Sequence, residues 1–363
     1  MPALVAVAAG LVVALLASAY ALLVLWSPRD PTPSPSESTF LTPSSPSTPQ
    51  QLHRLALPAT VALTVVVPAY NERDRLRVML RPAVEFLETR ELPTSSSAGA
   101  PRLPDGVERG SYEVLIVDDG SKDGTSDVAL ELAKEVEREF GAKRGTVKVC
   151  RLVRNRGKGG ATKHGVLHAS GHHILFVDAD GATHFPDLAL LEEELDKLEA
   201  VQASAAKGAP HGLVVGSRAH LVDSEAVVKR SALRNLLMRS FHLYLSLLGL
   251  STIRDTQCGF KLHARASAQL LYPSLHSPGW IFDCELLLVA ERCGVPLREV
   301  GVRWTEVPGS KLDVVTDSIR MARDLLVIRG NYLAGRWTTP GRVPREVVQA
   351  ARAAQATEGR KER

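Results

Sequence analysis

The stretch Leu63-Thr-Val-Val-Val67, closed by Pro68, decides the fold class. Every residue in it is apolar or β-branched, without the alternation of a half-exposed strand, so it predicts a strand buried on both faces. Strands of this kind belong to parallel sheets that helices cover on both sides. We therefore expect an α/β protein built around this segment.

Strand and helix patterns alternate after this segment. Strands are expected at residues 112–117, 147–152 and 173–177, and helices at about 72–88, 125–140 and 158–170. In the second helix, Val128, Leu132 and Val136 recur at helical spacing. This order is typical of a doubly wound, Rossmann-like, mostly parallel sheet, whose ligands bind beyond the carboxyl ends of the strands.

Three of these strands end in polar clusters. The clusters are Pro68-Ala-Tyr-Asn-Glu72, Asp118-Asp-Gly-Ser121 and Asp178-Ala-Asp-Gly181. Each one alone is also typical of a turn, because Asp, Gly and Ser bond their own backbone and tolerate turn dihedrals. Three acidic clusters at one edge of a single sheet instead favour a binding site.

Asp178 and Asp180 are the predicted metal ligands and the centre of the chemistry. Mg²⁺ and Mn²⁺ prefer carboxylate oxygens together with substrate phosphates, and the metal takes up negative charge as a diphosphate leaves. We expect Asp118 or Asp119 to accept a hydrogen bond from a base or ribose. Tyr70 is expected to offer a face on which the base stacks.

A basic loop at residues 154–160, Arg-Asn-Arg-Gly-Lys-Gly-Gly, precedes the third helix and includes Lys158. Cationic side chains and backbone N–H groups at a helix start suit a phosphate. A flexible basic turn is the alternative. The GxxxxGK[ST] and GxGxxG patterns are absent, which argues against a P-loop NTPase and a Rossmann dehydrogenase.

The N-terminal residues 3–26 form an unbroken run of apolar and small residues, long enough to cross a bilayer as a helix. A cleaved signal peptide is the alternative, but nothing charged precedes the run. Arg29 and the Arg/Lys-rich remainder follow it, so the positive-inside bias places the bulk of the chain in the cytosol. Residues 27–60, rich in Pro, Ser and Thr, are expected to be a disordered linker.

The remaining chain is divided by composition. A catalytic core is expected at 61–228, acceptor-side and membrane-interfacial helices at 229–338, a polar tail at 339–363, and surface insertions at 93–110 and 202–212. Segment 231–250 mixes Leu, Phe and Tyr with Arg, and segment 319–337 mixes Leu and Ile with Arg, as interfacial helices do. Amphipathic helices packed on the sheet are the alternative. Arg230, Arg234 and Arg239 suit a lipid phosphate.

Charge and cysteine usage exclude other classes. The net charge of +4 is too small for a dedicated nucleic-acid binder. Cys150, Cys258, Cys284 and Cys293 form no CxxC pair, so we expect reduced, buried thiols. His172 and His173 precede a strand and are expected to be core or surface residues rather than ligands.

Five motifs carry a resemblance to a known family. They are VVVPAYNE (65–72), VDDGSKDGT (117–125), NRGKGGA (155–161), FVDADG (176–181) and VGSR (215–218). In this order they resemble the family 2 inverting glycosyltransferases of GT-A fold, over roughly residues 63–336. Three later segments, RDTQCGFKL (254–262), WIFDCELL (280–287) and VPGSKLDVVTDS (307–318), are similar to the eukaryotic branch that glucosylates dolichyl phosphate.

The resemblance implies inverting transfer of glucose from UDP-glucose to dolichyl phosphate, with Mg²⁺ or Mn²⁺, for N-glycan precursor assembly. It also implies a single-pass anchor in the endoplasmic reticulum membrane and a catalytic domain facing the cytosol. The implied donor site comprises a nucleoside set, Pro68, Tyr70, Glu72 and Asp119; a metal and diphosphate set, Asp178, Ala179 and Asp180; and two basic residues near the phosphates, Arg218 and Lys311.

Several points stay open at this stage. Asp255, Asp283 and Glu285 are the acidic candidates on the acceptor side, and they either orient the acceptor, bind metal or pair with Arg254 and Lys261. The acceptor phosphate is already an oxyanion at neutral pH, so its attack on the anomeric carbon does not require a strong general base. Related mannosyl enzymes carry Gln where this chain has Ala182, so the third protein ligand of the metal is unassigned.

Three other functions are weighed against this one. A mannosyltransferase using GDP-mannose is the alternative within the family. A non-catalytic, membrane-tethered nucleotide-binding scaffold is the alternative from another class, although adjacent buried anions are costly unless a cation uses them. A processive polysaccharide synthase would need the Gln-x-x-Arg-Trp signature, which is missing.

Overall fold

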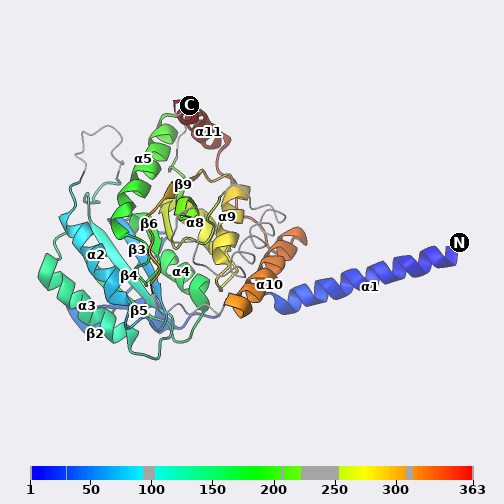
Figure 1. Ribbon diagram of the computed structural model, residues 1–363, viewed down its shortest axis with the longest axis horizontal. Helices are drawn as coiled ribbons and strands as arrows, with labels where there is room; N and C mark the ends of the chain where they lie inside the picture. The colour runs from blue at the N-terminus through cyan, green and yellow to red at the C-terminus, as the bar shows by residue number, and fades with distance from the viewer. Residues whose placement is uncertain are drawn as a thin grey trace.

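The computed structural model describes residues 2–29, 31–92, 103–205, 208–221, 253–307 and 314–361. Within these ranges the chain forms a mixed sheet in the order β2-β1-β5-β4-β3-β6-β8-β7-β9, with helices on both of its faces (Figure 1). The expected α/β class with a mostly parallel central sheet is confirmed.

The strands are β1 (Thr39–Thr42), β2 (Ser45–Gln51), β3 (Val61–Ala69), β4 (Tyr112–Asp118), β5 (Gly145–Arg151), β6 (Gly171–Val177), β7 (Leu213–Ser217), β8 (Phe260–Ala264) and β9 (Leu297–Gly301). The α-helices are α1 (Pro2–Trp26), α2 (Leu76–Thr89), α3 (Thr125–Phe140), α4 (Gly157–Leu167), α5 (Leu188–Ala205), α8 (Arg265–Leu271), α9 (Phe282–Cys293), α10 (Val314–Leu333) and α11 (Arg345–Lys361). Each strand and helix expected within residues 61–177 is present, with shifted ends for most of them.

The four central strands β5, β4, β3 and β6 run parallel. β3 lies between β4 and β6, so the strand order reverses on its two sides. A sheet of this kind opens a crevice at the carboxyl ends of the strands where the order reverses. The three polar clusters of the sequence therefore meet at one place.

Alternate side chains of β3 face two separate hydrophobic cores. Val65 and Val67 pack among residues of α2, α3 and α5, while Val66 packs among residues of α4, α8 and α9. A Cβ at Gly165 would lie 2.4 Å from Cγ1 of Val66, so this glycine lets α4 approach the sheet closely. The run of apolar residues in β3 therefore reflects burial of this strand on both faces of the sheet.

The linker expected at residues 27–60 is ordered along much of its length, contrary to the prediction. A 3₁₀ helix, η1 (Pro35–Ser38), leads into β1 and β2, and β1 pairs antiparallel with β5 at Leu41 and Val149. Phe40 is buried against the core. The prolines of β2 are tolerated because this strand lies at the edge of the sheet. The composition of the segment predicted disorder because the segment itself has little apolar surface. The apolar surface that orders it belongs to β5, which lies far along the chain.

The expected polar tail and second insertion also differ from the prediction. Residues of α11 contact α5, and Val343, Val347 and Ala351 are buried. Helix α5 continues through Gln202, whose buried amide group bonds both the N–H and the C=O of His211. An apolar stripe on one side of a largely polar helix orders the tail.

Helix α1 contains one candidate membrane span, Leu4–Trp26, which is 23 residues long and has no buried residue. It projects from the body of the protein and meets α10 at its C-terminal end (Figure 1). There the Ser27 hydroxyl lies 2.8 Å from the Asn331 side-chain nitrogen, which donates to it. A Cβ at Gly330 would lie 2.8 Å from Cδ1 of Leu23, so the two helices are in close contact.

Helix α10 covers most of the segment 319–337 that was expected to be interfacial. Leu325, Ile328 and Tyr332 are buried, while Ile319, Leu326 and Leu333 are exposed at seven-residue spacing. The helix contacts α9 and α1. Segment 231–250, with Arg234 and Arg239, lies outside the described residues, as does Arg230.

Candidate active site

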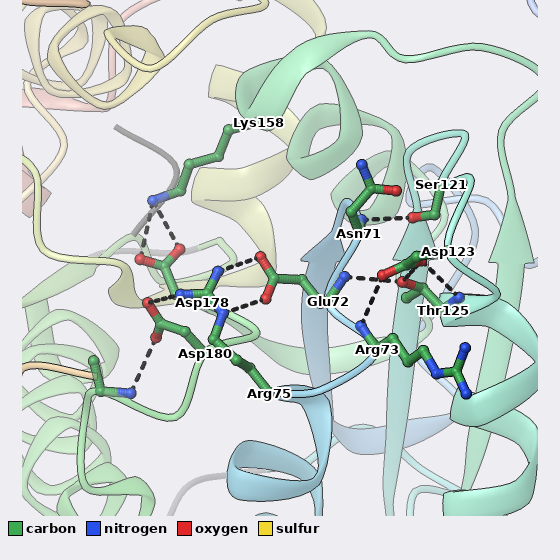
Figure 2. Close-up of polar contacts among 11 residues, drawn as sticks. Asn71, Glu72, Arg73, Arg75, Ser121, Asp123, Thr125, Lys158, Asp178 and Asp180 are labelled. Carbon is green, nitrogen blue, oxygen red and sulfur yellow. Dashed lines mark hydrogen bonds and ion pairs between the residues drawn. The ribbon is translucent and has the colours of Figure 1, made fainter. Parts of the chain in front are cut away.

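The first two polar clusters are locked together by backbone contacts (Figure 2). Asn71 has a positive φ of 53°, a conformation that Asn tolerates better than most residues. Its N–H donates to the Ser121 hydroxyl at 2.8 Å, and its side-chain oxygen accepts from the N–H of Lys122 at 2.9 Å. The Asn of the first cluster therefore fixes the geometry of the second.

Glu72 connects the first cluster to the third through Arg75. The Glu72 carboxylate accepts from Nε of Arg75 at 2.8 Å and from Nη2 at 2.6 Å. Nη1 of Arg75 lies 4.0 Å from Oδ2 of Asp180 (Figure 2). Arg75, which no sequence motif indicated, carries a positive charge next to the acidic cluster.

Asp178, Asp180 and Lys158 form the acidic site (Figure 2). Nζ of Lys158 lies 2.7 Å from Oδ1 and 3.0 Å from Oδ2 of Asp178. The side chains of Asp178 and Asp180 are 32% and 30% exposed, so a ligand can reach both. The basic loop thus places the Lys158 ammonium group in contact with Asp178, one of the two predicted metal ligands.

The two carboxylates of the acidic site interact unfavourably as like charges. Burial raises the pKa of Asp180, and the charge of Asp178 raises it further. Burial lowers the pKa of Lys158, but the neighbouring carboxylates, that of Asp178 above all, outweigh it and the net shift is upward. Two accessible carboxylates that repel each other fit a divalent cation, which would neutralise both.

Gly259 makes room for Asp178. The N–H of Asp178 donates to the Gly259 carbonyl at 3.0 Å, and a Cβ at position 259 would lie 2.1 Å from Oδ2 of Asp178. Any larger residue would displace the carboxylate. The glycine of the CGF motif is thus part of the site, although nothing local in the sequence places it there.

Asp118 and Asp119 have different surroundings. Asp118 accepts from the N–H of Ser121 at 2.9 Å and from the Ser126 hydroxyl, contacts that shape the turn. Asp119 accepts from the N–H groups of Arg156 and Gly157 at 2.7 and 2.8 Å. Burial raises the pKa of Asp119 to about 7. Of the two, Asp119 is the one that joins the basic loop to the strand ends.

Asp255 is paired, with a partner other than the two expected. It accepts from Nε and Nη2 of Arg218 at 2.7 and 2.8 Å, and from the Arg218 N–H at 2.9 Å. Burial raises the pKa of Asp255, but Arg218 outweighs it and the net shift is downward. The guanidinium also lies 5.5 Å from the ring centroid of Trp304. This bidentate pair fixes Arg218, the basic residue of the VGSR motif.

Asp283 and Glu285 are buried and engaged. Nζ of Lys261 lies 2.5 Å from Oδ1 of Asp283, the pairing that the sequence left open, and burial raises the pKa of Asp283. Glu285 accepts from the N–H groups of His276 and Ser277 at 2.9 and 2.6 Å, and from the Tyr332 hydroxyl at 3.1 Å. These contacts favour structural roles, because neither side chain is exposed by more than 1%.

The remaining predicted residues are distributed around the same edge. Pro68 and Ala179 adjoin the ends of β3 and β6, and Tyr70 is 36% exposed just beyond β3. Lys311 lies outside the described residues. All four cysteines are buried and unpaired, as expected.

His172 and His173 lie at the other end of β6 from Asp178. Nε2 of His173 is 3.0 Å from Oε1 of Glu199. The ligand atoms of these three side chains lie within 4.8 Å of one another, close enough to hold a metal ion. This group is separated from the acidic site by the length of the strand.

Comparisons with known proteins identify the family of this chain. The family model for glycosyl transferase family 2 matches residues 64–212. The dolichyl-phosphate β-glucosyltransferase of Drosophila melanogaster is 44% identical over 83% of this chain and 84% of its own length. The Saccharomyces cerevisiae enzyme of the same name is 39% identical over 90% of this chain and 92% of its own.

A solved structure also aligns. It is glucosyl-3-phosphoglycerate synthase from Mycobacterium tuberculosis in complex with Mn²⁺ and UDP-glucose, at 20% identity and a TM-score of 0.46, covering 74% of this chain and 78% of its own. The fly and yeast enzymes are 39–44% identical to this chain over 83–90% of its length, which shows the family. The chain is a glycosyltransferase and belongs to the dolichyl-phosphate β-glucosyltransferase family.

Proposed function

We propose that this protein transfers glucose, with inversion, from UDP-glucose to dolichyl phosphate and supplies a lipid-linked donor for N-glycan assembly. One observation carries the proposal. Asp178 and Asp180, which repel each other and are reachable, lie beside Lys158 at the carboxyl edge of a doubly wound sheet. Such a site matches the charge and the divalent cation of a nucleotide diphosphate.

Each side chain has a role in this proposal. Asp178 and Asp180 would hold Mg²⁺ or Mn²⁺, which supplies countercharge for the departing diphosphate. Lys158, which bonds Asp178 at this edge, would supply positive charge to a diphosphate oxygen. Arg218, held by Asp255, adds a second fixed positive charge. Asp119 and Tyr70 flank the space for the nucleoside.

The acceptor brings its own nucleophile. A phosphate monoester is an oxyanion at neutral pH, so one in-line attack at the anomeric carbon needs no protein base. This agrees with the engagement of Asp255, Asp283 and Glu285 by other protein groups. Their proposed part is to keep the site in shape.

The proposed membrane side of the protein follows from α1. We propose that α1 is a single-pass anchor in the endoplasmic reticulum membrane, with the catalytic domain in the cytosol. Because Ser27 bonds Asn331 at the base of α1, α10 lies where the span leaves the bilayer. The exposed Ile319, Leu326 and Leu333 would then contact the acyl boundary, from which the lipid acceptor arrives.

A transfer assay tests the proposal. Purified full-length protein is incubated with dolichyl phosphate and labelled UDP-glucose, GDP-mannose or UDP-N-acetylglucosamine, with and without EDTA. We expect a glucolipid from UDP-glucose alone, its loss in EDTA, and competition by UDP but not by GDP. A mannolipid from GDP-mannose would overturn the donor assignment, and nucleotide binding without transfer to any acceptor would support the non-catalytic scaffold.

A further inference from the structure

Glu37 is a buried carboxylate in the segment that joins the N-terminal helix to the sheet. It lies in η1 and is 1% exposed, although the residues around it are polar and partly exposed. A lone charge in such a place would cost several kcal/mol unless it were paired and hydrogen-bonded. Its partners therefore indicate why an acidic residue is buried there.

The partners of Glu37 come from the basic loop and its flanks. Oε1 accepts from the N–H of Val153 at 2.9 Å, and Oε2 accepts from the Arg156 guanidinium. The Glu37 carbonyl accepts from Nε2 of His164 at 2.8 Å. The residue before the loop, one residue within it and one residue of α4 are thus all attached to Glu37.

The carboxylate is ionised in this environment. Burial raises the pKa of Glu37, but the N–H groups of Val153 and Ser34 and the charge of Arg156 outweigh it, so the net shift is downward. The side chain of Arg156 is only 8% exposed. A buried, charge-assisted pair of this kind restricts the loop much more than a surface ion pair would.

The attached loop reaches two parts of the acidic edge. The N–H groups of Arg156 and Gly157 donate to Asp119, and the next residue, Lys158, donates to Asp178. Gly157 has a φ of +82°, and a Cβ there would lie 2.5 Å from the Pro278 carbonyl. The loop therefore has little room, and its conformation decides where Asp119 and Lys158 point.

We propose that Glu37 is a positioning residue for the nucleotide-sugar site, because it fixes the loop that orders Asp119 and Lys158. The segment beyond the membrane helix is thereby part of the active-site framework as well as a tether. This inference rests on the proposed function for the identity of the donor. The coupling between Glu37 and the loop does not depend on that identity.

The test uses full-length protein and the variants Glu37→Gln, Glu37→Asp and Thr39→Ala. Gln keeps the size but loses the charge, and Asp keeps the charge but shortens the reach. Thr39 is the matched control, because its hydroxyl group bonds the Ser36 carbonyl within the same segment. The measurements are amide hydrogen exchange at residues 153–160 and the KM for UDP-glucose and for dolichyl phosphate.

We expect Glu37→Gln to raise amide exchange in the loop and to raise the KM for UDP-glucose about tenfold, the effect of losing one charge-assisted contact. The KM for dolichyl phosphate should stay unchanged, Glu37→Asp should have a smaller effect, and Thr39→Ala should match the wild type. A merely structural role would lower the yield of folded protein without changing the donor KM.

Failure of the positioning role and failure of the proposed function would give different results. Unchanged loop exchange and unchanged donor KM in Glu37→Gln would overturn the positioning role. If the wild type transfers no glucose, the proposed function fails, and the exchange measurement still decides whether Glu37 orders the loop.

Discussion

Two pairs of acidic residues with the same sequence spacing have opposite environments in this molecule. Asp178 and Asp180 follow a strand, are about one-third exposed and face a lysine and each other. Asp283 and Glu285 lie on α9, are no more than 1% exposed and bond separate partners. Residues two apart on an α-helix point about 200° away from each other, so this second pair cannot share a ligand.

The difference teaches that spacing alone does not define a metal site. At a strand end the chain can turn both carboxylates toward one point, whereas a helix sends one to the sheet and the other to α10. The first pair is left with unbalanced charge that a ligand can use. The second has its charge compensated inside the protein, which favours stability over chemistry.

The largest expected effect tests the first pair. Asp180→Asn should lower glucose transfer at least about 10³-fold, because the loss of metal countercharge costs several kcal/mol in the transition state. Transfer assays and membrane fractionation would measure it. Asp74→Asn, at an exposed carboxylate nearby, is the matched control and should retain activity. Full activity of Asp180→Asn would refute the metal assignment.

The next largest effect is expected from a substitution of Lys261, the partner of the buried Asp283. Lys261→Met leaves Asp283 buried without its partner and should lower the free energy of unfolding by about 3–5 kcal/mol. Thermal denaturation would report it. The double variant Lys261→Met/Asp283→Leu should recover most of the loss, and a melting temperature equal to that of the wild type in the single variant would contradict the structural role.

A smaller effect is expected at the other member of the buried pair. Tyr332→Phe removes one hydrogen bond to Glu285 and should cost about 1.5–3 kcal/mol, since the acceptor is charged. The melting temperature should fall while the KM for UDP-glucose stays constant. Tyr20→Phe, at an exposed tyrosine of α1, is the control for stability and should melt like the wild type. A changed donor KM in Tyr332→Phe would instead connect Glu285 to substrate binding.

The smallest effect is a pH dependence at Asp119. Its pKa of about 7 means that the ionised form, which accepts hydrogen bonds, is lost as the pH falls from 8 to 6. The ionised fraction drops about tenfold over this range, so the KM for UDP-glucose should rise by at most about tenfold. Asp119→Asn should have a flatter profile between these pH values, and an equally steep one would assign the dependence to another group.

Folding stability should change in the opposite direction at Asp119. Its folded pKa lies above the usual value for an aspartate, so the folded state binds the proton more tightly than the unfolded state. This contribution to stability is present at low pH and is lost as the pH rises through about 7. The same carboxylate thus favours donor binding where it costs stability.

Much of the fold could be predicted because its signals are local. The run Leu63-Thr-Val-Val-Val67 indicated a buried parallel strand, and helix α3 has the predicted bounds. The acidic strand ends could be placed together, because parallel strands bring their carboxyl ends to one edge. Gly259 and Arg75 escaped prediction, since their importance depends on contacts with Asp178 and Asp180 that only folding creates.

The sequence by itself determined the apolar N-terminal helix, the doubly wound core and the acidic edge, because periodicity and composition act within a few residues. Only the tertiary structure decided which carboxylates are reachable and which are internally paired. It also decided that the Pro- and Ser-rich segment after the N-terminal helix is ordered around Glu37. The apolar surface and the cations that order this segment lie more than a hundred residues away along the chain.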